Sequence, residues 1–162
     1  MNQAVKFYDP NLAKSVTKTG QAVMKQLTHH KMNQAVKKLW IEHLQSDWYE
    51  QNFDVDPIGG IQLRTTDNKW SVFGVLCNIH AQAFPDVASQ QDGPDVYMDY
   101  CYVIPYEVSL WAGLRKATGD YNCRIEFEQP VTIQGETFYD LESMSLAGIP
   151  FYMIADIIEE KF

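Results

Sequence analysis

Hydrophobic residues recur at helical spacing in several parts of the chain. The segment "MNQAVKKLWIEHLQSDW" places its apolar residues on one side and predicts a helix that ends near Ser46. "GVLCNIHAQAF" is mostly apolar, which is typical of a buried helix. In "VIPYEVSLWAGL" Pro105 fits the first turn of a helix, and in "AGIPFYMIADIIEEKF" Gly148 ends one helix while Pro150 opens the last.

Alternating apolar residues predict strands between these helices. A β-hairpin is expected near residues 61–73, around a Thr-Asp-Asn turn, and a strand near residues 96–102. One or two further strands are expected near residues 121–134, followed by a turn at Gly135, whereas residues 85–94 have the composition of a loop. The pattern as a whole predicts a helix-rich α+β domain with a small antiparallel sheet and a C-terminal helix.

Length and composition restrict the class of protein. A chain of 162 residues with 46% hydrophobic and 21% charged residues is long enough for one folded domain with its own core. No apolar run approaches the roughly 20 residues that span a bilayer, and the first residues lack the apolar centre of a signal peptide. The three cysteines form no CxxC pair, which indicates reduced thiols in a cytoplasm.

Charge is distributed unevenly along the chain. Residues 1–40 contain seven lysines and one aspartate, a net charge of +6. Residues 41–162 contain six basic and twenty acidic side chains, a net charge of −14. Such a body repels nucleic acid phosphate, which argues against direct DNA or RNA binding. A solvated acidic surface that aids solubility and a basic arm that folds onto an acidic body are the alternatives.

The hexamer "MNQAVK" occurs twice, at residues 1–6 and 32–37. The two copies diverge immediately afterwards, so they do not mark a repeated folding unit. We interpret residues 1–31 as a lysine-rich N-terminal extension and residues 32–162 as a single α+β domain.

Four blocks of the chain together carry a resemblance to known sequences. They are "LWIEHLQSDWYEQ" (39–51), "WSVFGVLCNI" (70–79), "IPYEVSLWAGL" (104–114) and "MSLAGIPFYMIADIIEE" (144–160). Their order and spacing resemble a group of uncharacterised small proteins carried by phages and prophages, over residues 32–162. The resemblance implies a mobile-element origin and a cytoplasmic protein that acts inside a bacterial host. It implies no established activity. Paired cysteines of the group's second block are Val72 and Phe73 here.

Cys77 and His80 are the first candidate site. They lie three residues apart on a predicted helix and therefore share one of its faces. A thiol–imidazole pair there could serve as nucleophile and base, or as half of a metal site. The apolar surroundings favour a small core cysteine instead. No motif for zinc, calcium or nucleotide phosphate is present, so no metal or cofactor is expected.

An acidic, tyrosine-rich segment is the second candidate site. The sequence "PDVASQQDGPDVYMDYCY" interleaves carboxylates with aromatic rings, a mixture suited to protein binding or to imitating a row of phosphates. The residues expected to contact a partner are Asp92, Asp95, Tyr97, Asp99 and Tyr100. A plain surface loop followed by a half-buried strand is the structural alternative.

Three functional hypotheses are open at this point. The first is a phage- or prophage-encoded accessory protein that binds and inhibits a host protein. The expected target is a nucleic-acid-handling defence complex, of the kind that anti-CRISPR and anti-restriction proteins inhibit. The second is a small enzyme, or a domain that binds a nucleotide-like metabolite, with a pocket near Cys77 and His80. The third, DNA binding through the lysine-rich first 40 residues, predicts a steep salt dependence and conflicts with the charge of the body.

Deletion of residues 1–31 is expected to leave a protein that folds, because the predicted domain begins at Met32. The free energy of unfolding should stay within about 1 kcal/mol of the value for the full chain. Urea unfolding followed by circular dichroism measures it. Loss of cooperative folding in the deletion would make the first copy of the hexamer an integral part of the domain.

Overall fold

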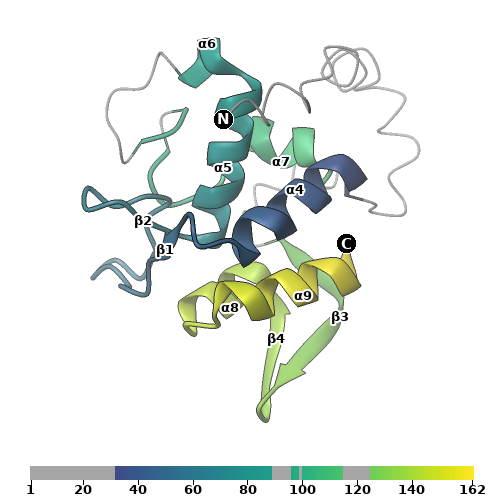
Figure 1. Ribbon diagram of the computed structural model, residues 1–162. Helices are drawn as coiled ribbons and strands as arrows, with labels where there is room; N and C mark the ends of the chain where they lie inside the picture. Colours follow the sequence, from purple (N-terminus) through teal and green to yellow (C-terminus); the bar gives the residue numbers. More distant parts are fainter. Residues whose placement is uncertain (1–31, 89–95, 99, 115–124) are drawn as a thin grey trace.

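The computed structural model describes residues 32–88, 96–98, 100–114 and 125–162 (Figure 1). Residues 1–31, predicted as an extension, and part of the strand region near 121–134 lie outside the described residues. The elements are α4 (Gln34–Gln45), β1 (Glu50–Gln51), β2 (Lys69–Trp70), α5 (Val72–Ala83), α6 (Pro85–Ala88), α7 (Tyr106–Ala112), β3 (Glu126–Ile133), β4 (Glu136–Asp140), α8 (Leu141–Leu146) and α9 (Phe151–Lys161). The predicted α+β class with a small antiparallel sheet and a C-terminal helix is confirmed.

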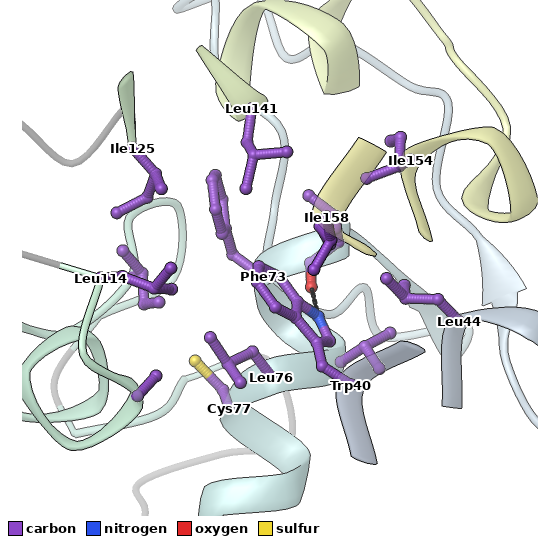
Figure 2. Close-up of a cluster of buried hydrophobic side chains, with 14 of the residues drawn as sticks. Trp40, Leu44, Phe73, Leu76, Cys77, Leu114, Ile125, Leu141, Ile154 and Ile158 are labelled. Atoms are coloured by element: carbon purple, nitrogen blue, oxygen red, sulfur yellow. Dashed lines mark hydrogen bonds between the residues drawn. The ribbon is translucent and has the colours of Figure 1, made fainter. Parts of the chain in front are cut away.

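Helix α4 packs against both α5 and α9 and joins them into one core. Trp40 of α4 is fully buried, and its indole N–H donates to the Val72 carbonyl oxygen at 3.0 Å. Figure 2 shows its ring among Leu44, Leu76 and Ile158, side chains that come from all three helices. Apolar burial of this kind is the main favourable term in folding.

Polar contacts fix both ends of this packing. The Asn33 side chain caps α4 by accepting from the N–H groups of Ala35 and Val36. Lys37, only 8% exposed, donates from Nζ to the Glu159 carbonyl oxygen at 2.8 Å, and its charge pairs with the Glu159 carboxylate at 3.3 Å. A lysine of the basic N-terminal region therefore holds α4 against α9.

The antiparallel hairpin β3–β4 projects beyond α8 and α9 (Figure 1). Gln134 and Gly135 form its turn with φ values of 51° and 83°, so the turn predicted at Gly135 is confirmed. The register shifts between Glu126 and Val131, where Pro130 lacks the N–H that a regular ladder needs. Asp140 ends β4 and caps α8 by accepting from the Ser143 N–H.

Two of the predicted strands are much shorter than expected. Near 61–73 the hairpin is reduced to a single antiparallel bridge between Arg64 and Trp70, because Val72 and Phe73 already belong to α5. Instead, β2 pairs in parallel with β1. Near 96–102 there is a single bridge, between Tyr97 and Tyr100, closed by reciprocal backbone hydrogen bonds of 2.8 and 2.9 Å.

Two further observations complete the fold. Pro85–Ala88 forms the short helix α6 rather than the predicted loop, while the following residues up to 95 lie outside the described part of the chain. Within the described ranges, no helix has both the length and the apolarity needed to cross a membrane.

Gly74 lets α5 approach the preceding chain closely. A Cβ built on Gly74 would lie 1.7 Å from the Leu63 carbonyl oxygen. That oxygen also accepts from the Ser71 N–H, and Ser71 is the N-cap of α5. Ser71, just before α5, and Gly74, in its first turn, thus both contact the Leu63 carbonyl group. This contact leaves no room for a side chain at residue 74.

Gly74→Ala is expected to destabilise the protein by about 3 kcal/mol or more, because overpacking against backbone outweighs the better helix propensity of alanine. Urea unfolding measures the change. Gly135→Ala serves as the control, because a Cβ built at Gly135 meets no neighbouring atom within 4 Å. The positive φ of residue 135 alone should destabilise this variant, by about 1 kcal/mol. Equal effects of the two substitutions would contradict the close approach.

Candidate functional site

The predicted Cys77–His80 site is part of the core. Both residues lie on α5, with 3% and 5% of their surface exposed. His80 hydrogen-bonds through Nδ1 to the Tyr97 hydroxyl at 2.5 Å. Rings of Phe84 and Trp111 lie 4.5 and 5.0 Å from the imidazole, centroid to centroid. The imidazole is therefore surrounded by aromatic rings.

Burial determines the protonation of both groups. It lowers the pKa of His80 from 6.5 to about 4, so the imidazole is neutral at neutral pH. It raises the pKa of the Cys77 thiol well above its ordinary value, so the reactive thiolate is not formed. The lowered pKa of His80 and the raised pKa of Cys77 fit a structural role for both side chains and argue against nucleophilic catalysis.

Metal binding also lacks a ligand set in the described part of the chain. No group of three or more His, Cys, Asp or Glu residues lies close enough there to hold an ion. Cys77 does line a cavity of about 190 Å³ beside α5, together with Asn78 and Tyr97. His80 is not among the described residues of that wall.

The predicted partner-binding segment divides into three parts. Asp92, Asp95 and Asp99 lie outside the described residues. Tyr97 is only 6% exposed and directs its hydroxyl to His80, so it offers no surface to a partner. Tyr100 is 39% exposed and is available for contact.

A second acidic, aromatic segment, residues 47–58, lies within the described chain and exposes large apolar side chains. Its apolar residues Trp48, Phe53, Val55 and Ile58 are 61%, 55%, 48% and 76% exposed. Four carboxylates and no basic side chain accompany them: Asp47, Glu50, Asp54 and Asp56. Exposed aromatic and aliphatic groups among charges are typical of a protein-binding surface.

Hydrogen bonds hold this 47–58 segment in place at its middle. The backbone N–H of Asn52, a residue only 2% exposed, donates to the Trp70 carbonyl oxygen at 2.7 Å. The Gln51 side chain donates to the Ile149 carbonyl oxygen at 2.9 Å and accepts from the Phe151 N–H at 2.8 Å. The segment is thereby attached to β2 and to the start of α9.

Its two ends are also attached. Near the start, the Tyr49 hydroxyl hydrogen-bonds to His43 Nδ1 and accepts from the Asn78 amide, each at 2.8 Å. Near the end, the Asp56 carboxylate accepts from the Tyr102 hydroxyl at 2.8 Å. Tyr102 is two residues along the chain from Tyr100, the exposed one of the two described residues in the predicted contact set. A surface held in this way loses little conformational entropy on binding.

Sequence reasoning missed this surface although its signal was present. "DWYEQNFDVDPI" has the same interleaving of acidic and aromatic residues as the predicted partner-binding segment near residues 92–100. The feature that distinguishes the two segments is the exposure of Trp48, Phe53 and Ile58, which depends on the tertiary structure.

Comparison with known proteins adds one match. A family model described as a domain of unknown function (DUF8296) matches residues 32–162. No curated protein and no solved structure matches the chain.

The protein is expected to lose stability as the pH falls from 7 to 5. The folded pKa of His80, about 4, lies below its ordinary value of 6.5, so the unfolded chain binds more protons in this range. The loss from His80 should reach about 2 kcal/mol at pH 5. Burial also lowers the pKa of His43, which adds a loss of the same sign.

Urea unfolding at pH 7, 6 and 5 measures this dependence. His80→Gln should reduce the slope, because glutamine does not titrate, while His43 retains its own contribution. An unchanged slope in His80→Gln would mean that folding does not shift the pKa of this imidazole.

Proposed function

Because the chain belongs to the DUF8296 family, whose description assigns no activity, we propose a function from its surface. The protein is a phage- or prophage-encoded accessory protein that acts in the cytoplasm of its bacterial host. It binds and inhibits a host protein that handles nucleic acid, as a defence complex does. The observation that carries this proposal is the 47–58 segment, with exposed Trp48, Phe53 and Ile58 among four carboxylates.

Charge complementarity selects the chemistry of the partner. The 47–58 segment has four acidic and no basic side chains, and residues 41–162 carry a net charge of −14. A complementary partner surface is basic, and basic grooves are characteristic of proteins that bind nucleic acid phosphates. The acidic segment occupies such a groove, while the aromatic side chains supply the apolar contacts that phosphate lacks.

The resemblance of four sequence blocks to phage and prophage proteins supports a bacterial host as the setting. The chemistry of Cys77 and His80 gives less support to the alternative of a small enzyme, since burial keeps the thiol protonated. The alternative of a small-molecule site retains the support of the cavity beside α5.

Substitution of Trp48 and Ile58 by alanine is expected to weaken partner binding at least about 30-fold, because exposed aromatic anchors dominate interface energies. The full chain is used as bait in host lysate, the captured protein is purified, and its affinities for the chain and for labelled DNA are measured. Wild-type chain should compete with the DNA, and its affinity should fall with added salt.

Tyr139→Ala is the matched control, because Tyr139 is also 65% exposed but lies on the β3–β4 hairpin. It should bind and compete like the wild type. The proposal is overturned if the double variant competes with DNA as well as the wild type does, or if the captured protein does not bind nucleic acid.

A further inference from the structure

The cavity beside α5 is separate from the exposed 47–58 surface. Its volume is about 190 Å³, and its described walls come from α5, from the chain on either side of the 65–69 turn, and from Ala88, Val96 and Tyr97. The α5 wall includes Gly74, Cys77 and Asn78, and the opposite wall includes Leu63, Arg64 and Trp70. Among the described residues, the lining combines apolar groups with the polar groups of Asn78 and Tyr97 and one cationic side chain, Arg64.

Arg64 lines this cavity and has no acidic partner among the described residues. Its guanidinium carbon lies 4.7 Å from the centre of the Trp70 ring, a cation–π contact. Its Nε donates to Asn68 Oδ1 at 3.0 Å. Within the described part of the chain, no carboxylate forms an ion pair with Arg64, although the protein has 21 acidic side chains. The ring contact and the Nε hydrogen bond hold the guanidinium at the cavity, while its terminal N–H groups can donate to a ligand.

The remaining walls are also held in place. Trp70 contacts the Tyr49 ring edge-to-face, with centroids 5.3 Å apart. Asn78 donates its amide to the Tyr49 hydroxyl at 2.8 Å, so its orientation is fixed. Gly74 lets α5 lie directly against the Leu63 backbone, which fixes these two parts of the wall relative to each other. A ligand would therefore meet an ordered ring, an ordered amide and an ordered cation.

Volume restricts the ligand to a small one. An apolar protein cavity of about 150 Å³ holds one benzene molecule, and sites for drug-sized ligands are about 300 Å³ or larger. A cavity of about 190 Å³ has room for one ring and a small substituent.

We propose that this cavity binds a monocyclic aromatic carboxylate. The carboxylate accepts hydrogen bonds from the terminal N–H groups of Arg64, a planar pairing that suits the guanidinium fork. The ring lies against the apolar part of the lining, beside Leu63 and Cys77. This site is independent of the proposed partner-binding function and requires no chemical step.

Benzoate and its neutral counterpart benzamide test the site on the full chain, by NMR titration and calorimetry at 150 mM salt, about physiological ionic strength. Benzoate is expected to bind saturably, with a Kd on the order of 1 mM or lower, and benzamide at least about tenfold more weakly. Arg64→Gln should reduce benzoate affinity at least about tenfold.

A second variant separates a site from general attraction to a cation. Ala81 lines the cavity, so Ala81→Leu fills it and should abolish binding although Arg64 is retained. Lys69→Gln removes a neighbouring cation outside the cavity wall and should bind benzoate like the wild type. Melting temperatures establish that each variant is folded. Absence of saturable benzoate binding to the wild type, equal affinity for benzamide, or unchanged affinity in Arg64→Gln overturns the proposal.

Discussion

The burial of Trp40 is the interaction on which the rest of the structure depends. Its ring fills the space between α4, α5 and α9, and its N–H reaches the first residue of α5. A buried indole needs a partner for its N–H, and the Val72 carbonyl provides one only when α4 crosses α5 at this point. The position of α5 then fixes Ser71 and, through the chain before it, β2.

Trp70 connects the core to both candidate sites. Its carbonyl oxygen accepts from Asn52 and anchors the 47–58 segment, while its ring stacks on Arg64 and meets Tyr49. Trp70 thus connects the exposed surface with the cavity, as Asn78 does through its hydrogen bond to Tyr49. A substitution at Trp70 would disturb both together, whereas Trp48 and Arg64 each belong to one of them. Trp70 also gives a physical route by which a ligand in the cavity would affect the surface.

The helices could be predicted from sequence because their signals are local. Apolar spacing, Pro105 and the Gly148–Pro150 boundary all act within a few residues. The short strands could not, because two-residue strands have no period and their pairing is set by distant chain. At 96–102 the alternation was misleading: Met98 has a φ of 49°, which turns the chain there.

The candidate sites divide in the same way. That Cys77 and His80 share a helix face follows from their spacing. Their protonation follows from burial by distant parts of the chain, among them the Tyr97 and Trp111 rings around His80. The composition of residues 47–58 was visible in the sequence. Its exposure was not, because Asn52, Gln51 and Asp56 hold it through partners up to 100 residues away.

Charge and apolar anchors have different tasks on such a surface. A net charge of −14 over residues 41–162 attracts any basic macromolecule and raises the rate of encounter, but it does so without much selectivity. Selectivity must come from groups with a fixed shape that exclude water when they are covered, and Trp48, Phe53 and Ile58 are such groups. Since the hydrogen bonds of Asn52 and Gln51 fix the backbone between them, these side chains keep their spacing before any partner arrives. An acidic surface can select one partner only where the backbone that presents its apolar side chains is fixed, as it is in the 47–58 segment.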